Sequence, residues 1–268
     1  MKKIVFLTTL ILFTITLFSQ NHTLTLKQNV INNGYNFWIY TPYGYDTLQE
    51  KTPLIIFLHG ASLCGNNPDK VLRYGPLHAI NMGRRIDAIV LAPQNPGGSW
   101  QPKKINDVLE WVKTNYKSDT NRIYVIGMSL GCYGTLDYAA TYPDKIAAAM
   151  AICGGTTMKN YDNMAKLPLW ILHGTNDKAV PHKYTKVIAD YLKSQKKDGR
   201  FRYDLLQGES HTSIAKVLYL KKTYEWLLSH NLQDENREVN RNISIKTADL
   251  KNAYSDMSRN AKKPTVRR

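Results

Sequence analysis

The sequence contains few cysteines and no internal repeats. Three cysteines among 268 residues, Cys64, Cys132 and Cys153, are too few for a disulfide framework and too scattered for a metal site. One pair could bridge in an oxidising compartment, but the spacing does not say which pair. Cys132 and Cys153 fit better as small buried apolar side chains. A small fold stabilised by several disulfide bonds or by a cysteine-bound zinc ion is therefore excluded.

Apolar runs long enough to approach the length of a membrane span are also lacking, apart from one at the start of the chain. Lys2 and Lys3 precede an almost wholly apolar stretch, residues 4–18, and the chain turns polar after Ser19. This order predicts a signal peptide over residues 1–19. The alternative is a retained membrane anchor, but the stretch is shorter than the roughly 20 residues of a spanning helix. We therefore expect an exported protein, periplasmic or secreted, with no stable membrane insertion after cleavage.

Acidic residues are scarce compared with basic ones. The chain has 36 lysines and arginines against 21 aspartates and glutamates, a formal net charge of +15. Such a charge can attract acidic polymers or cell surfaces, or it can simply keep the protein soluble. No helix-turn-helix or zinc-finger pattern accompanies it, so nucleic acid is not an expected partner.

Strand and helix patterns alternate between about residues 35 and 230. Continuous apolar runs predict buried strands, and apolar residues at i, i+3 and i+4 predict helices. The expected strands are 35–40, 54–58, 88–92, 122–127, 146–152, 168–173 and 201–206; the expected helices are 105–116, 130–141, 184–192 and 214–228, with a turn at 118–121. This alternation predicts an α/β fold with a mostly parallel central sheet flanked by helices on both faces.

The predicted domain boundaries follow from the same pattern. Residues 20–230 carry the strand and helix patterns and form the expected catalytic domain. Residues 231–268 are polar and basic with few large apolar side chains, so we expect a partly disordered tail with a short helix near 248–254.

A nucleophile pattern lies between a predicted strand and a predicted helix. Residues 127–131 read Gly-Met-Ser-Leu-Gly, which matches G-x-S-x-G. In a sharp strand-to-helix turn the serine hydroxyl is lifted clear of the sheet, and the glycines avoid a clash. The pentapeptide alone could arise by chance, but Ser62, Ser99 and Ser210 lack this setting. The pattern therefore predicts Ser129 as the nucleophile.

A serine hydroxyl needs a base and an orienting carboxylate, which follow it in the order acid, histidine. His211 lies in a loop after the strand 201–206 and before the last helix. Asp177 lies in the loop after the strand 168–173. The other candidates occupy strands, helix ends or earlier connections: His173, His182, His230, Asp162 and Asp204. We therefore predict a Ser129–His211–Asp177 triad.

Two further loops supply candidate binding groups. The loop after the first buried strand offers the Ala61 N–H, which with the Leu130 N–H could hold an oxyanion. Gln94 and Trp100 follow the next strand and are candidates for substrate binding. The Trp100 ring could stack on a sugar or aromatic acyl group, or equally pack against its own protein. This chemistry needs no cofactor and no metal ion.

Together these residues resemble a known family. The resemblance covers about residues 35–228, and the segments that carry it are Leu54 to Cys64, Leu72 to Pro76, Ala92 to Gln94, Trp100, Asn121 to Gly134, Ile152 to Gly155 and His173 to Pro181. They are similar to the polyhydroxybutyrate-depolymerase-like and feruloyl-esterase-like carboxylesterases of the α/β-hydrolase superfamily, close to carbohydrate esterase family one.

The resemblance implies an exported hydrolase of acyl esters. Many members act on acylated plant polysaccharides, and the family triad would fall on the three residues already predicted. Leu130 and Cys132 replace the methionine and second glycine of the usual S-M-G-G elbow, a change that should be tolerated. Ser210-His211-Thr212 departs from the usual G-H-D loop, which alters the wall beside the base and puts the substrate in doubt.

The sequence therefore predicts a serine carboxylesterase. Its partner would be a small-molecule or polysaccharide acyl ester, from plants or cell walls, cleaved through an acyl-enzyme intermediate. Two alternatives remain open: a serine peptidase like prolyl oligopeptidase, and a non-catalytic carbohydrate-binding protein on the same scaffold.

Overall fold

The computed structural model describes residues 21–197, 199–258 and 260–268. The expected signal peptide, residues 1–19, lies outside these described residues. None of the helices within them is long and apolar enough to cross a bilayer.

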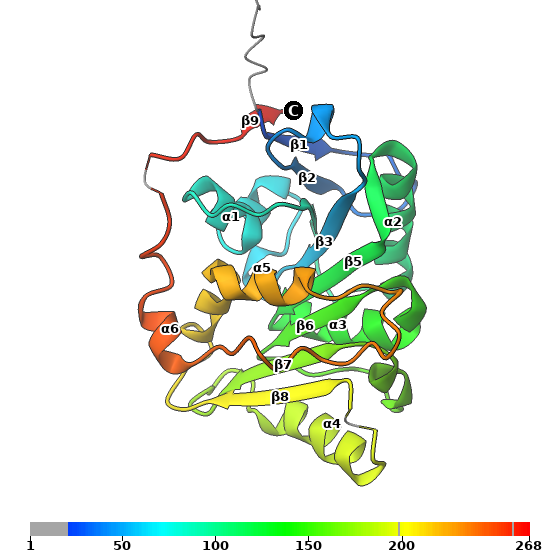
Figure 1. Ribbon diagram of the computed structural model, residues 1–268, viewed down its shortest axis with the longest axis vertical. Helices are drawn as coiled ribbons and strands as arrows, with labels where there is room; N and C mark the ends of the chain where they lie inside the picture. The colour runs from blue at the N-terminus through cyan, green and yellow to red at the C-terminus, as the bar shows by residue number, and fades with distance from the viewer. Residues whose placement is uncertain (1–20, 198, 259) are drawn as a thin grey trace, which may run out of the picture.

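The centre of the fold is a mixed sheet of nine strands in the order β8-β7-β6-β5-β3-β4-β2-β1-β9 (Figure 1). The six strands from β8 to β4 are parallel to one another, β2 is antiparallel to both of its neighbours, β4 and β1, and β9 is parallel to β1. The strands are β1 (Thr23–Lys27), β2 (Phe37–Thr41), β3 (Thr52–Leu58), β4 (Ile89–Pro93), β5 (Ser118–Met128), β6 (Ala148–Ile152), β7 (Leu169–Gly174), β8 (Phe201–Leu206) and β9 (Thr265–Arg267).

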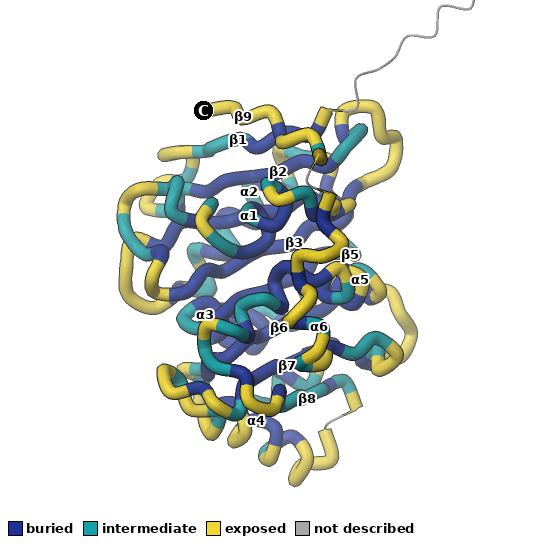
Figure 2. Tube along the Cα trace, turned by 90° about the vertical axis from the view of Figure 1, so that its left-hand side faces the viewer, coloured by how far each residue is buried: buried dark blue, intermediate teal, exposed yellow. Residues whose placement is uncertain are grey.

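Helices cover both faces of this sheet, which confirms the predicted α/β-hydrolase fold. They are α1 (Pro76–Asn81), α2 (Pro102–Asn115), α3 (Leu130–Thr141), α4 (Lys183–Ser194), α5 (Lys221–Leu228) and α6 (Thr247–Lys251). Alternate side chains of a strand enter opposite cores: Ile55 and Phe57 pack on the side of α1, α5 and α6, while Ile56 packs on the side of α2, α3 and α4. The strands β3, β4, β6 and β7 are buried along their length, and exposed segments gather in the outer loops (Figure 2).

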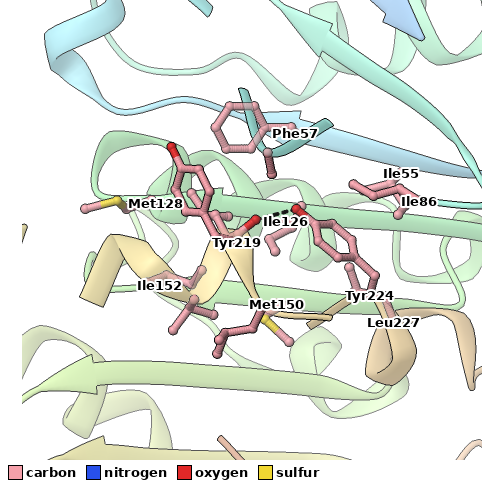
Figure 3. Close-up of a cluster of buried hydrophobic side chains, with 14 of the residues drawn as sticks. Ile55, Phe57, Ile86, Ile126, Met128, Met150, Ile152, Tyr219, Tyr224 and Leu227 are labelled. Carbon is pink, nitrogen blue, oxygen red and sulfur yellow. Dashed lines mark hydrogen bonds between the residues drawn. The ribbon is translucent and has the colours of Figure 1, made fainter. Parts of the chain in front are cut away.

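The core beneath α5 is rich in aromatic side chains. Tyr219, Tyr224 and Leu227 lie in one buried cluster with Phe57 and Ile126 of the sheet (Figure 3). The buried Tyr224 hydroxyl is not left unpaired, because it donates to a backbone carbonyl. Large, mostly aromatic side chains therefore pack α5 against the middle of the sheet.

Two local predictions need correction. Residues 118–121, expected to form a turn, are the first residues of β5, which pairs with β3 through an irregular register near Thr52. The last predicted helix, 214–228, is divided into a 3-10 segment, η6 (Ile214–Tyr219), and α5. Leu220 causes the division because its backbone is extended, with ψ at 137°.

The C-terminal segment also differs from expectation, since its described residues pack along the domain instead of forming a partly disordered appendage. It runs from α6 along one side of the molecule to β9, which pairs with β1 at the far edge of the sheet (Figure 1). Arg84, 5% exposed, binds Asp256 through two hydrogen bonds. The short helix expected near 248–254 is present as α6. The buried apolar side chains of this C-terminal segment are Val239, Ile245, Leu250, Ala253 and Met257, and their irregular spacing gave no sign that they would be buried.

Candidate active site

The predicted nucleophile, base and acid meet at one edge of the sheet. Ser129 follows β5, Asp177 follows β7 and His211 follows β8, all at carboxyl ends of parallel strands. The register keeps these ends within two residues of one another: Met128 pairs with Ile152, Ile152 pairs with Leu172, and β7 and β8 both end two residues farther on. The His211 Nε2 atom lies 3.0 Å from the Ser129 Oγ atom, and the His211 Nδ1 atom lies 2.7 Å from the Asp177 Oδ2 atom.

The backbone at Ser129 is strained, as the sharp turn requires. Its φ and ψ are 57° and −120°, an unusual conformation for a residue with a side chain. A Cβ atom at Gly131 would lie 1.8 Å from the Leu58 carbonyl oxygen, and one at Gly127 would lie 2.2 Å from the Gly131 oxygen. Both glycines are therefore required by close backbone contacts, and the turn directs the serine hydroxyl toward His211.

Asp177 is fixed from several sides. Its Oδ1 atom accepts the backbone N–H groups of Ala179 and Val180, at 3.0 and 2.8 Å. Its Oδ2 atom faces His211 and also lies 3.4 Å from the Nε2 atom of the buried His173. Burial lowers the pKa of His173, so this ring stays neutral and acts as part of the scaffold, with Nε2 donating to the Val180 carbonyl. The carboxylate thus keeps one oxygen directed at the base.

A pocket of about 460 Å³ opens beside the Ser129 hydroxyl. The residues that line it are Gly60, Ala61, Ser62, Tyr74, Met128, Ser129, His211, Thr212 and Ala215. None of these described residues is an aspartate, glutamate, lysine or arginine, so the pocket suits an uncharged group.

The two predicted oxyanion donors lie at helix starts next to this pocket. Ala61 begins the 3-10 segment η2 (Ala61–Leu63), and Leu130 begins α3. N–H groups at such positions have no acceptor within their own helix. The neighbouring Gly60 N–H is already bound, since it donates to the Tyr74 hydroxyl at 2.6 Å. Tyr74 therefore holds the backbone just before Ala61.

Gln94 and Trp100 occupy other places than predicted. Trp100 is 3% exposed, and its indole N–H donates to the His59 carbonyl at 3.1 Å. Gln94 is 4% exposed, and its amide donates to the Leu63 and Gly65 carbonyls at 2.8 Å. Neither side chain lines the pocket, because the loop that carries them folds inward. Both support the backbone around residues 59–65, and the expectation that they contact substrate is corrected.

The sequence did not single out Tyr74 or Cys153 for the site. Tyr74 lies in one of the segments that carry the family resemblance, but nothing in that segment assigned its side chain a role in the site. Cys153 follows β6 directly, at the same edge as Ser129 and Asp177, and this position could have drawn attention to it. Its side chain is fully buried, as predicted, and its φ is 46°.

Several of the known proteins to which this chain is similar are esterases. A family model described as phospholipase/carboxylesterase matches residues 102–227. A probable acetylxylan esterase A from Aspergillus clavatus is 25% identical over 224 residues, covering 74% of this chain and 69% of the relative. The crystal structure of a thermostable esterase superposes with a TM-score of 0.63 at 23% identity, over 79% of this chain and 63% of that one. A ferulic acid esterase from Anaeromyces mucronatus gives a TM-score of 0.54 at 15% identity, over 74% and 87%. The chain thus spans about two thirds of the length of the acetylxylan esterase and of the thermostable esterase.

Proposed function

We propose that this chain, which belongs to the carboxylesterases of the α/β-hydrolase superfamily, cleaves acyl esters with Ser129, His211 and Asp177 as its catalytic triad. The observation that carries the proposal is the pair of hydrogen bonds at His211, one to a serine hydroxyl and one to a buried carboxylate. A neutral imidazole that donates from Nδ1 to Asp177 has its Nε2 lone pair free to take the serine proton.

The reaction proceeds through an acyl-enzyme. The Ser129 Oγ atom attacks the ester carbonyl carbon while the His211 Nε2 atom takes its proton, and Asp177 stabilises the imidazolium. The Ala61 and Leu130 N–H groups hold the oxyanion; losing one such donor typically costs about 100- to 1000-fold in rate. His211 then protonates the departing alcohol. Water activated by the same ring attacks the acyl-enzyme and releases the acid and Ser129.

We infer that the substrates carry uncharged acyl groups. The pocket beside Ser129 supports this, because its described lining contains no acidic or basic side chain other than His211. The acetylxylan esterase relative supports acyl groups borne by plant or cell-wall polysaccharides. Substrates of that kind are met outside the cell, in keeping with the signal peptide proposed for residues 1–19.

The test is Ser129→Ala assayed with p-nitrophenyl acetate. Loss of the nucleophile should lower kcat by more than about 10⁴-fold, while the circular dichroism spectrum and unfolding midpoint stay near those of the wild type. Ser99→Ala, in an exposed loop, is the matched control and should retain full activity.

Two further measurements separate this function from the alternatives. A fluorophosphonate probe should label the wild type and not Ser129→Ala; a folded wild type that resists the probe would favour a non-catalytic binding protein. Acyl esters should be cleaved faster than short peptide anilides of similar size; the reverse order would favour a peptidase. Retention of more than a few per cent of the esterase rate by Ser129→Ala would remove Ser129 as the nucleophile.

A further inference from the structure

Cys153 brings a third type of metal-binding group to the triad. It lies at the end of β6, between the strand that leads to Ser129 and the strand that leads to Asp177. Ligand atoms of Cys153, Asp177 and His211 all lie within 4.8 Å of one another. A thiol, a carboxylate and an imidazole are the three side-chain types that bind Zn²⁺ in proteins.

We propose that Cys153, Asp177 and His211 form an inhibitory site for a soft divalent cation such as Zn²⁺ or Cd²⁺. Inhibition of ester hydrolysis by the ion rests on the proposed function, whereas binding of the ion to these three residues does not. Three protein ligands would leave the fourth tetrahedral position to water, as in many zinc sites. The ion is not a cofactor here, because it would replace the hydrogen bond between His211 and Asp177 that the catalytic base requires.

The geometry is close to what such an ion requires. With bonds of about 2.0–2.3 Å, tetrahedral ligand atoms lie roughly 3.5 Å apart. The His211 Nδ1 and Asp177 Oδ2 atoms, now at 2.7 Å, would have to separate by under about 1 Å. The Cys153 sulfur, which lies within 4.8 Å of a ligand atom of each residue, would have to approach by no more than roughly 1.3 Å. The side chain of His211 is 20% exposed and gives the cluster its opening to solvent.

Binding would disable the base through its tautomer. The ion takes the Nδ1 lone pair, so the ring proton moves to Nε2, and the Cys153 thiol releases its proton to water as the thiolate–metal bond forms. An Nε2 atom that carries a proton donates to the Ser129 Oγ atom and cannot accept from it. Metal binding and proton transfer from Ser129 are thus mutually exclusive.

The other two cysteines serve as internal controls. Cys64 is partly exposed and is therefore more accessible than Cys153 to an ion in solution. Cys132 is buried in the opposite core, among residues that pack with α2, α3 and α4. Neither belongs to the cluster, so a general affinity of thiols for metals would act at Cys64 first.

The first experiment measures esterase activity of the full chain against ZnCl₂ and CdCl₂, with each variant compared with its own uninhibited rate. The wild type and Cys64→Ala should be inhibited at the same metal concentration and recover with EDTA. Cys153→Ala should need at least about tenfold more metal for half-inhibition, in line with losing one of three ligands. Equal half-inhibitory concentrations for Cys153→Ala and the wild type would overturn the proposal.

The second experiment detects the site without activity. Titration with Cd²⁺ should produce the ultraviolet absorption of a Cd–thiolate bond in the wild type, in Cys64→Ala and in the double variant Cys64→Ala/Ser129→Ala. It should be absent from the double variant Cys64→Ala/Cys153→Ala, in which the accessible thiol of Cys64 cannot contribute. Cys153→Ser, which keeps the side-chain volume, gives the same comparison if the alanine variant does not fold. Absence of this absorption from the wild type overturns the metal site, whereas a wild type that binds Cd²⁺ but hydrolyses no ester overturns only the proposed function.

Discussion

His59 accepts a hydrogen bond at Nε2 from the backbone N–H of Asn95, at 3.0 Å. Its Nδ1 atom lies 2.8 Å from the Gly60 carbonyl oxygen and must be the donor there. These two hydrogen bonds fit a neutral imidazole with its proton on Nδ1. A proton added to Nε2 would point at the Asn95 N–H group and break the hydrogen bond between them. Burial lowers the pKa of His59 to about 4. This ring joins two loops next to Ala61, one of the proposed oxyanion donors.

We predict that the stability of the protein falls between about pH 6.5 and pH 4 because of His59. Its pKa in the folded protein, about 4, is below the unfolded value of 6.5, so the unfolded state binds the proton more readily in this range. The contribution is fully present above about pH 6.5 and is lost as the pH falls toward 4. It should amount to roughly 3 kcal/mol at most.

Urea unfolding at pH 7 and pH 4.5 measures this effect. His59→Gln, whose side-chain oxygen can still accept the Asn95 N–H, should lose less stability between the two pH values than the wild type. An equal loss in both proteins would show that His59 is not responsible.

Tyr74 gives the second prediction. Its hydroxyl accepts the Gly60 N–H at 2.6 Å, and burial raises its pKa, so it stays protonated. Tyr74→Phe keeps the ring that packs against Phe57 but frees the backbone before Ala61. We expect kcat for p-nitrophenyl acetate to fall roughly 10- to 100-fold, as small misplacements of a catalytic group do, with KM little changed.

A matched control exists at Tyr45. Its hydroxyl also accepts a backbone N–H at 2.6 Å, from Lys117, away from the residues that line the pocket. Tyr45→Phe therefore removes the same kind of bond without touching the loop, and kcat should stay close to the wild-type value. If both variants lose kcat equally, Tyr74 acts only through general stability.

The sequence was most informative where strands are buried on both faces. The runs that became β3, β5 and β7 are continuous and apolar, so their carboxyl ends could be placed to within a residue or two. Ser129 follows the end of β5 directly, and Asp177 lies three residues after the end of β7. Chain order then selected His211 among the histidines, and the structure has these three side chains within hydrogen-bond distance.

The direction of a loop, by contrast, depends on contacts that are distant in sequence. Trp100 follows a strand at the site edge, but it turns inward because Gly134 on α3 leaves room for its ring. Leu250 lies in the short helix that was expected near 248–254, but a lone leucine among polar residues has no periodicity from which its burial could be predicted. Its burial depends on a surface formed by η6, more than thirty residues earlier in the chain.

Leu250 packs the C-terminal segment against the domain near His211. It is 2% exposed in α6, and α6 contacts η6, which begins three residues after His211. Leu250→Ala should lower the free energy of unfolding by about 2–5 kcal/mol, as buried leucine truncations do. Lys251→Ala, the exposed neighbour in the same helix, should change it by less than about 0.5 kcal/mol.

The same pair of variants tests whether the C-terminal segment supports the proposed base. If α6 holds η6 and thereby the His211 loop, Leu250→Ala should lose esterase activity on heating at a temperature below its global unfolding midpoint, because the loop would loosen before the sheet does. Lys251→Ala should lose activity and structure together. Coincident loss in Leu250→Ala as well would mean that α6 stabilises the whole domain without a particular connection to His211.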